Sequence, residues 1–195
     1  MRPDVKSCVI PFSNLEEIAY EYCKQENHIS DETPERRREK FEKQAAKVWD
    51  GIKHAEVQVA LVFVEQGTEG TSLFPKEWLD KYMEESKQPF RVCLYWLRIT
   101  AELPAEKKIS QQFLQDTWCS SVILAAKDKV EQYLLEDRWR AKKVVSVAPG
   151  IDDLPLECVG SWAQTCMEAG VDVTVDSSGH MIPENSLFAA YIELQ

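Results

Sequence analysis

Runs of β-branched and aromatic residues recur along the chain, and each has the length of a strand. The longest cover residues 56–65 (EVQVALVFVE) and 90–100, and shorter runs follow at 142–147, 171–175 and 187–194. Residues 90–100 are apolar on both faces, which is typical of a strand in the middle of a sheet. We therefore predict that these runs are strands of one sheet.

Apolar residues at helical spacing predict two helices before the first long run. One is expected after Ser13, because Ser13 and Glu16 fit a capping box. The other is expected after Thr33 and Pro34, which fit a cap followed by a proline at the first helical position. Residues 1–55 are therefore predicted to form N-terminal helices.

Three further helices are predicted between the later strands. A short one begins at Pro75, a long one covers residues 109–136, and another covers 156–169. The long helix is expected to pack on the sheet and to bury Phe113, Trp118, Val122, Ala125 and Leu134.

Helices and strands interleave irregularly, which favours an α+β fold. We predict a single domain, 1–195, in which the N-terminal helices precede an α+β core at 56–195. Its central sheet should be mixed or largely antiparallel, with helices on its flanks. A doubly wound nucleotide-binding fold would need regular strand–helix alternation and a glycine-rich first turn, and the sequence has neither.

The charge balance narrows the range of partners. The 195 residues include 23 Lys and Arg against 33 Asp and Glu, for a net charge of −10. No basic stretch could follow a phosphate backbone, so nucleic acid is not an expected partner.

No run approaches the roughly 20 apolar residues of a membrane span, and the N-terminal apolar run is too short for a signal peptide. No membrane contact and a cytoplasmic location are expected.

Six cysteines are spread through apolar segments, at positions 8, 23, 93, 119, 158 and 166. They form no C-x-x-C pair, and no Cys/His cluster has the spacing of a zinc site. We expect six reduced thiols and no bound metal.

Two segments have unusual backbone requirements, although common catalytic motifs such as the P-loop or G-x-S-x-G are absent. In residues 146–153 (SVAPGIDD), a strand ends in a Pro-Gly pair that favours a type II turn, with exposed backbone groups suited to a ligand. Residues 176–186 (DSSGHMIPENS) could line a site or form a wide hairpin loop.

In this order, three segments resemble the reactivation (activation) domain of cobalamin-dependent methionine synthase. They are 148–150 (APG), the Gly170-Val171 break and 181–186 (MIPENS), which match the family's Ala-Pro-Gly turn, Gly-Val break and Met-x-Pro-x-x-Ser loop. Upstream, residues 113–121 and the strand 91–100 are similar to the family's helix start and apolar strand. The resemblance covers residues 90–195.

The resemblance implies an S-adenosylmethionine site along the Pro-Gly turn. The family's domain docks on a corrinoid whose cobalt is Co(II); a one-electron reductant forms Co(I), which takes the methyl group. The domain positions the reactants and supplies no catalytic residue. The chain departs from the family at Ser146 and Ile151, where the family has Arg and Tyr. The cofactor-binding residues implied are Ala148, Pro149, Gly150, Met181, Pro183 and Ser186.

The sequence therefore predicts a free-standing relative of this domain, with a corrinoid protein or methyltransferase as its partner. Whether it is itself an enzyme stays open. One alternative is a partner module of a corrinoid protein that does not bind S-adenosylmethionine. Another is an unrelated small-molecule enzyme in which Asp152, Asp153 or His180 acts as an acid or a base.

Overall fold

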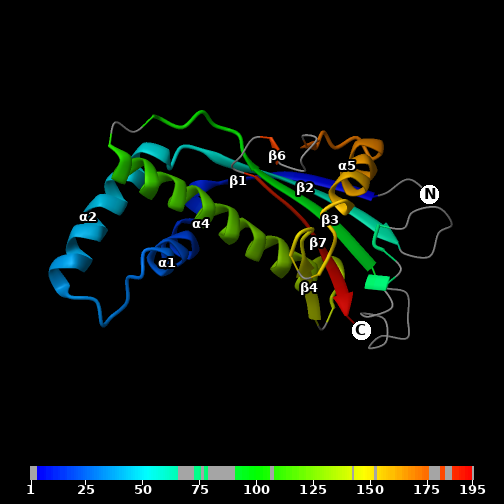
Figure 1. The fold of residues 1–195 in the computed structure, drawn as a ribbon, viewed down its shortest axis with the longest axis horizontal. Coiled ribbons are helices and arrows are strands. Elements are labelled where there is room, and N and C mark those ends of the chain that lie inside the picture. The colour runs from blue at the N-terminus through cyan, green and yellow to red at the C-terminus, as the bar shows by residue number, and fades with distance from the viewer. Residues whose placement is uncertain are drawn as a thin grey trace.

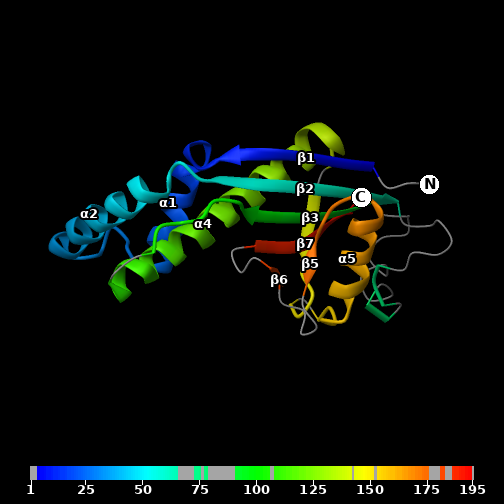
Figure 2. The same ribbon diagram turned by 90° about the horizontal axis from the view of Figure 1, so that it is seen from above.

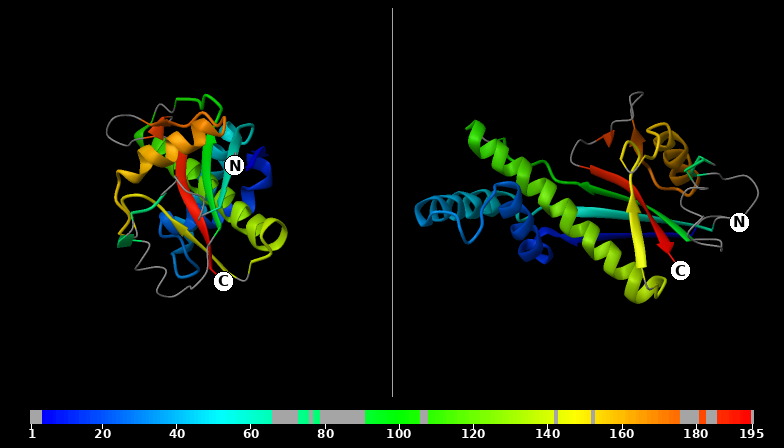
Figure 3. Two further views of the ribbon diagram at one scale, coloured as in Figure 1. Left: turned by 90° about the vertical axis from the view of Figure 1, so that its right-hand side faces the viewer. Right: turned by 60° about the horizontal axis from the view of Figure 1, so that its bottom comes forward.

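The central element is a five-stranded antiparallel sheet in the order β1-β2-β3-β7-β4. The computed structural model describes residues 4–65, 73–75, 77–78, 91–105, 108–141, 143–151, 153–175, 181–182 and 186–194. The strands are β1 (Asp4–Pro11), β2 (Glu56–Glu65), β3 (Arg91–Ile99), β4 (Lys143–Val147) and β7 (Ser186–Leu194). The edge strand β4 runs steeply across β1–β3 in Figures 2 and 3, because a twisted sheet rotates each strand relative to its neighbour.

Helices cover both faces of the sheet (Figure 1). On one face lies α4 (Ile109–Tyr133), which continues into a π-helical turn, η2 (Leu134–Arg138). Against α4 pack α1 (Glu16–Glu26), which follows a short 3-10 turn, η1 (Phe12–Asn14), and α2 (Glu35–Ile52). The opposite face carries α5 (Cys158–Glu168) and a small ribbon of β5 (Thr174–Val175) and β6 (Met181–Ile182). The α+β fold class is confirmed.

Alternation along the strands divides the buried side chains into two clusters. In β3, Tyr95 and Leu97 pack with the helices α1, α2 and α4, whereas Leu94 and Trp96 pack with α5. This is the period of two that a strand imposes. We call the two sides of the sheet the helical face and the α5 face. The prediction that β3 is central is confirmed, because it is apolar and buried on both sides.

Stacked aromatic rings fill the helical face. Trp118 of α4 lies 4.6 Å from Trp49 of α2 and 5.9 Å from Tyr20 of α1, measured between ring centroids. The indole Nε1 of Trp118 donates a hydrogen bond to the carbonyl oxygen of Ala45 at 3.2 Å. These contacts hold α1 and α2 against α4 beyond the end of the sheet (Figure 2).

Two predictions about the sheet are wrong. Residues 4–11, which belong to the segment 1–55 predicted to form N-terminal helices, form the edge strand β1, paired with β2 from Asp4↔Phe63 to Pro11↔Glu56. Residues 171–175 do not join the central sheet, because their last two residues pair with β6. Short segments with weak alternation take whichever edge the folded structure offers, so pattern alone does not assign their partner.

Several helix details also differ from the prediction. Phe113 is 62% exposed, whereas Trp118, Val122, Ala125 and Leu134 are buried as predicted. The reason is visible in Figure 1, where the first turns of α4 extend past the sheet. Neither α1 nor α2 has a side-chain cap: Ser13 lies in η1, and Pro34 precedes the first helical residue. Of the helix expected from Pro75, Pro75 itself is not helical, Glu77 and Trp78 are helical, and the other residues lie outside the described ones.

Candidate functional site

The segment after β4 forms the predicted turn. The N–H of Ile151 donates to the carbonyl oxygen of Ala148 at 3.0 Å, with Pro149 and Gly150 between them. Gly150 has a φ of 80°, as the third residue of a type II turn requires. A Cβ there would lie 3.5 Å from Cδ1 of Leu156, an ordinary contact, so backbone conformation rather than crowding demands glycine.

Hydrogen bonds within the segment already engage part of the turn. The N–H of Gly150 donates to the carbonyl oxygen of Leu154 at 2.8 Å, and Leu154 donates back to Ile151 at 3.0 Å. Leu154 is buried on the α5 face and anchors the loop, while Ile151 is 64% exposed. The turn is therefore well defined, but the N–H of Gly150 and the carbonyl of Ala148 are not free to receive a ligand.

Ser146 occupies the position where the resemblance would place an arginine. Its hydroxyl shares a hydrogen bond of 2.9 Å with the hydroxyl of Tyr95, on the helical face. Tyr95 stacks on Tyr191 with ring centroids 4.8 Å apart. Burial raises the pKa of Tyr95, and the bond to Ser146 acts in the opposite direction. Ser146 thus belongs to a neutral, part-buried hydroxyl pair and does not supply a cation to the turn.

The remaining implied residues lie along β6 and β7. Met181 pairs with Val175 in the β5-β6 ribbon, and Ser186 opens β7 opposite Arg98. Pro183 and His180 lie outside the described residues. The β4–β7 register places Val147 opposite Ala190, four residues from Ser186. At about 3.4 Å per residue, the Pro-Gly turn leaves the sheet about 14 Å along β7 from Ser186. The register therefore does not join these two segments.

A pocket of about 260 Å³ lies on the α5 face, between β1–β3 and the end of α5. One row of register partners crosses the three strands here and consists of Ser7, Ala60 and Trp96. Its lining consists of Val5, Ser7, Gln58, Ala60, Trp96, Arg98, Gly170, Val171 and Asp172. The Gly170-Val171 break and Arg98, the register partner of Ser186, thus meet at one place.

The end of α5 explains how Asp172 reaches the pocket. Gly170 has a φ of 89° and donates to the carbonyl oxygen of Met167, while Val171 donates to that of Cys166, both at 2.9 Å. This pair of bonds is a Schellman motif, which ends a helix and turns the chain. Val171 is buried on the α5 face, and the next residue, Asp172, is exposed at the rim of the pocket.

Trp96 is 4% exposed and lines the pocket, yet its indole Nε1 has no hydrogen-bond partner in the part of the chain that the structure describes. Two other buried indoles give a contrast. Trp162 Nε1 donates to the carbonyl oxygen of Leu73 at 2.7 Å, and Trp118 Nε1 to that of Ala45. An unpaired buried N–H is rare and costs on the order of 1–3 kcal/mol.

Arg98 lies next to this indole. Its guanidinium carbon is 4.8 Å from the centroid of the Trp96 ring, and its Nε donates to Oε1 of Gln58 at 2.6 Å. No carboxylate within the described ranges forms an ion pair with Arg98. The pocket therefore combines an arginine that lacks an acidic partner with an indole N–H that lacks an acceptor.

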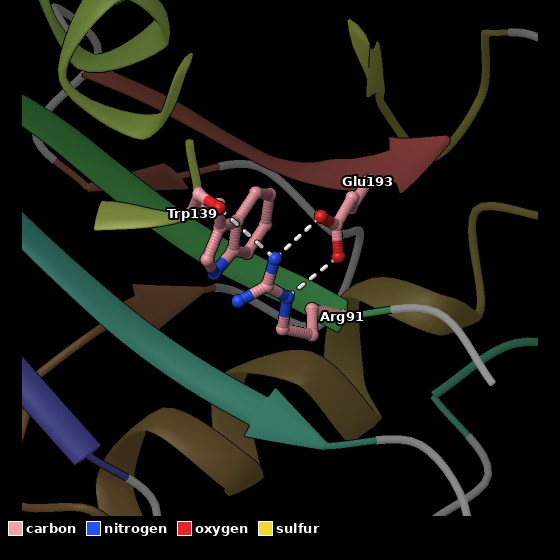
Figure 4. A network of polar contacts seen from close by, with 3 residues as sticks. All are labelled: Arg91, Trp139 and Glu193. Carbon is pink, nitrogen blue, oxygen red and sulfur yellow. Dashed lines mark hydrogen bonds and ion pairs between the residues drawn. The ribbon is translucent and has the colours of Figure 1, made fainter. Parts of the chain in front are cut away.

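Arg91, at the other end of β3, shows the usual arrangement (Figure 4). Its Nε and Nη2 donate to the two carboxylate oxygens of Glu193, and Nη2 also donates to the carbonyl oxygen of Trp139 at 3.2 Å. Glu193 is only 5% exposed, so this bidentate pair compensates the burial of its charge. We assign it a structural role.

A wider groove of about 820 Å³ lies where α1, α2 and α4 meet. Its floor contains Trp49 and Trp118, and neither of the two buried, unpartnered atoms in the described structure lines it. The charged residues of its lining are Glu16, Glu17, Glu42, Asp50 and Lys129. An acidic rim over a fully bonded floor does not indicate a particular ligand.

The described residues show no arrangement that supports the alternative of an enzyme with an acid or a base in this loop. Asp153 is exposed in the loop after the turn, with a φ of 57°, and Asp152 lies outside the described residues. All six cysteines are free thiols, and only Cys8 is exposed. Across the described ranges, no three His, Cys, Asp or Glu side chains are placed to hold a metal ion, and no helix is long and apolar enough to cross a membrane.

The pocket is a site that the sequence analysis missed, although it had singled out Gly170-Val171 and Ser186 at its edge. A cation on the same strand face as a tryptophan, as in Trp96-Leu97-Arg98, was a weak signal for it. Comparison with known proteins finds no matching family model and no similar curated protein.

Proposed function

We propose that this chain is a free-standing relative of the methionine synthase activation domain. In this proposal it docks on a corrinoid-dependent methyltransferase and assists its reductive methylation. The supporting observation is that two of the three matched segments have backbone conformations that their glycines require. Gly150 completes a type II turn at the end of β4, and Gly170 ends α5 in a Schellman motif.

The chain's part in this activity would be positioning. The methyl acceptor would be the partner's corrinoid. A one-electron reductant would supply Co(I), which would take the methyl group of S-adenosylmethionine and release S-adenosylhomocysteine. Ile151 and Leu156 are 64% and 49% exposed beside the Pro-Gly turn, so apolar side chains are available there for contact with a partner. The implied residues add no acid, base or nucleophile.

A second candidate is the same docking role without S-adenosylmethionine. It is favoured by the bonding of the turn, because Gly150 N–H and Ala148 C=O are engaged within the chain. Ser146 also supplies no cation, since its hydroxyl is held by Tyr95. A lost charge-assisted contact lowers affinity by about ten- to a hundredfold. The residues of the turn thus fit this ligand poorly.

Calorimetry with millimolar S-adenosylmethionine separates the two candidates. The informative variant is Ile151→Tyr, which restores the family's aromatic residue at an exposed position. It should bind more tightly than the wild type if the ligand lies along the turn. Leu156→Tyr is the matched control, because it adds the same side chain to the same loop and should not tighten binding. If neither the wild type nor Ile151→Tyr shows heat of binding with S-adenosylmethionine, only the second candidate, docking without this ligand, is left.

Docking needs its own assay. A cobalamin-dependent methionine synthase without its activation domain is held as Co(II), with a one-electron reductant and S-adenosylmethionine, and methylcobalamin is followed by absorbance. Addition of this chain should restore methylation under the first candidate. Under the second, the chain should form a complex with the Co(II) enzyme in sedimentation without restoring methylation. If neither occurs, the proposed function is wrong.

A further inference from the structure

We infer that the pocket on the α5 face binds the headgroup of a free α-amino acid, with the carboxylate at Arg98 and Trp96 and the ammonium at Asp172. The inference rests on three features of the pocket. They are donors without acceptors, an acidic group at the rim, and a volume that admits only a small ligand.

The indole of Trp96 is the strongest indication. Its Nε1–H is buried and lacks an acceptor within the described residues, and the tryptophan itself lines the pocket. Natural proteins pair almost all such groups, and an exception calls for an explanation. An indole N–H can only donate, so the missing partner is an acceptor. A carboxylate oxygen from a ligand would complete the bond.

Arg98 supplies the charge for the same group. Its Nε is engaged by Gln58, which leaves the two terminal nitrogens for a ligand. Terminal guanidinium nitrogens match the two oxygens of a carboxylate in a bidentate geometry. The contact with the Trp96 ring holds the guanidinium against the indole, and for this reason we assign one anion to both donors.

The lining of the pocket also includes the opposite charge. Asp172 lines it from the segment after α5 and forms no ion pair with any cation in the described parts of the chain. A carboxylate there suits an ammonium group, which a simple anion such as acetate does not have. An arginine and an aspartate that line one pocket therefore favour a zwitterion.

The volume limits the size of the ligand. At about 260 Å³ the pocket is smaller than the roughly 300–1,000 Å³ of typical small-molecule sites. It admits an amino acid but not the whole of S-adenosylmethionine. The inference is independent of the proposed function: an amino acid could bind here whether or not the chain docks on a corrinoid protein.

The test uses the isotope-labelled full chain and the common amino acids, each at millimolar concentration, with glycine as the bare headgroup. We expect at least one amino acid to move the indole N–H signal of Trp96, identified as the signal lost in Trp96→Phe. The indole signal of Trp162, which is already bonded to Leu73, should stay in place. If no amino acid moves the Trp96 signal, the inference is wrong.

Variants then separate the three contacts. For the amino acid that binds, Trp96→Phe and Arg98→Gln should each raise the Kd by about ten- to a hundredfold. Asp172→Asn should weaken the binding of the amino acid and leave the binding of the corresponding deaminated acid unchanged. Lys129→Gln, in the distant helical groove, is the control for a lost positive charge and should leave the Kd unchanged. Unchanged binding in Arg98→Gln would overturn the assignment.

Discussion

The two faces of the sheet use the same residue types in different ways. On the helical face, Arg91 is held by the carboxylate of Glu193, and the indole of Trp118 donates to a backbone carbonyl. On the α5 face, Arg98 has only the amide of Gln58 among the described residues, and the indole of Trp96 has no acceptor there. The first face satisfies its polar groups internally, whereas the second leaves two donors beside a pocket.

One atom on the helical face departs from this pattern. Oε1 of Gln115, in α4, is buried and has no hydrogen-bond partner in the described structure. It is an acceptor and lines none of the pockets discussed above. An isolated, unpaired acceptor of this kind lowers stability. On the α5 face, by contrast, the unpaired indole N–H belongs to a residue that lies next to a cation and a cavity. The comparison therefore concerns grouped donors and not single unsatisfied atoms.

The largest effect is expected from Trp118→Ala on the helical face. Trp118 is 2% exposed and its ring packs against those of Trp49 and Tyr20, so truncation should lower the free energy of unfolding by about 3–5 kcal/mol. Phe113→Ala, on the exposed side of the same helix, is the control and should change it by about 0.5 kcal/mol or less. Urea titration measures both. Similar losses in the two variants would contradict the packing described for α4.

The next effect differs in size between two tryptophans of the α5 face. Trp162→Phe leaves the carbonyl oxygen of Leu73 without its donor and should cost about 1–3 kcal/mol of stability in addition to the lost ring volume. Trp96→Phe also loses ring volume, but the donor it removes has no partner in the described structure, so it should cost less than Trp162→Phe. Thermal and urea unfolding of both variants give the comparison. A loss in Trp96→Phe as large as that in Trp162→Phe would contradict the contrast between the two indoles.

A smaller effect is expected from two glycines near the candidate segments. Gly150→Ala places a Cβ on a residue with a φ of 80° and should cost about 1–2 kcal/mol. At Gly160, in α5, an added Cβ would meet nothing within 4 Å, so Gly160→Ala should stabilise the protein by about 0.5–1 kcal/mol. Equal shifts of the melting temperature would argue against the turn conformation.

The last effect is a loss of stability that is absent near neutral pH and begins at alkaline pH. Burial raises the pKa of Cys23, Cys119 and Cys166 from 9.0 to about 12, on both faces of the sheet. A hydrogen bond to Asp128 raises the pKa of Tyr22 from 10.0 to about 12. The folded chain keeps protons that the unfolded chain releases, so this stability is complete below pH 9 and is lost as the pH rises towards 12.

Urea titrations at increasing pH test this loss. Tyr22→Phe cannot ionise at this position, so its stability should fall less than that of the wild type as the pH passes 10. A wild-type stability that is constant through this range would show that the thiols and the tyrosine are not protected in the fold.

Much of the fold could be predicted from local pattern. The strands β2 and β3 have the predicted bounds to within one residue, and α4 begins at Ile109 as expected. Their apolar runs are long enough that period and length leave little ambiguity. The strand β1 was missed because its residues are mostly exposed, so it lacks the alternation that marks a half-buried strand.

The candidate site was predictable only in part. The Pro-Gly turn follows from two adjacent residues, whose preferred angles are local properties. Its hydrogen-bond occupancy does not follow from the Pro-Gly pair alone, because the carbonyl oxygen of Leu154, further along the same loop, accepts from the N–H of Gly150. The departure at Ser146 was visible in the sequence, but its partner, Tyr95, lies 51 residues away.

By itself, therefore, the sequence determined the features that depend on neighbouring residues: the long strands and helices, the type II turn at Gly150 and the helix end at Gly170. The tertiary structure alone decided which strands pair, which of the two arginines of β3 meets a carboxylate, and which indole lacks an acceptor. The reason is that a buried donor is satisfied or left unpaired by groups from distant segments. At the pocket these segments are β1, β2, β3 and the end of α5, and only the folded chain brings them together.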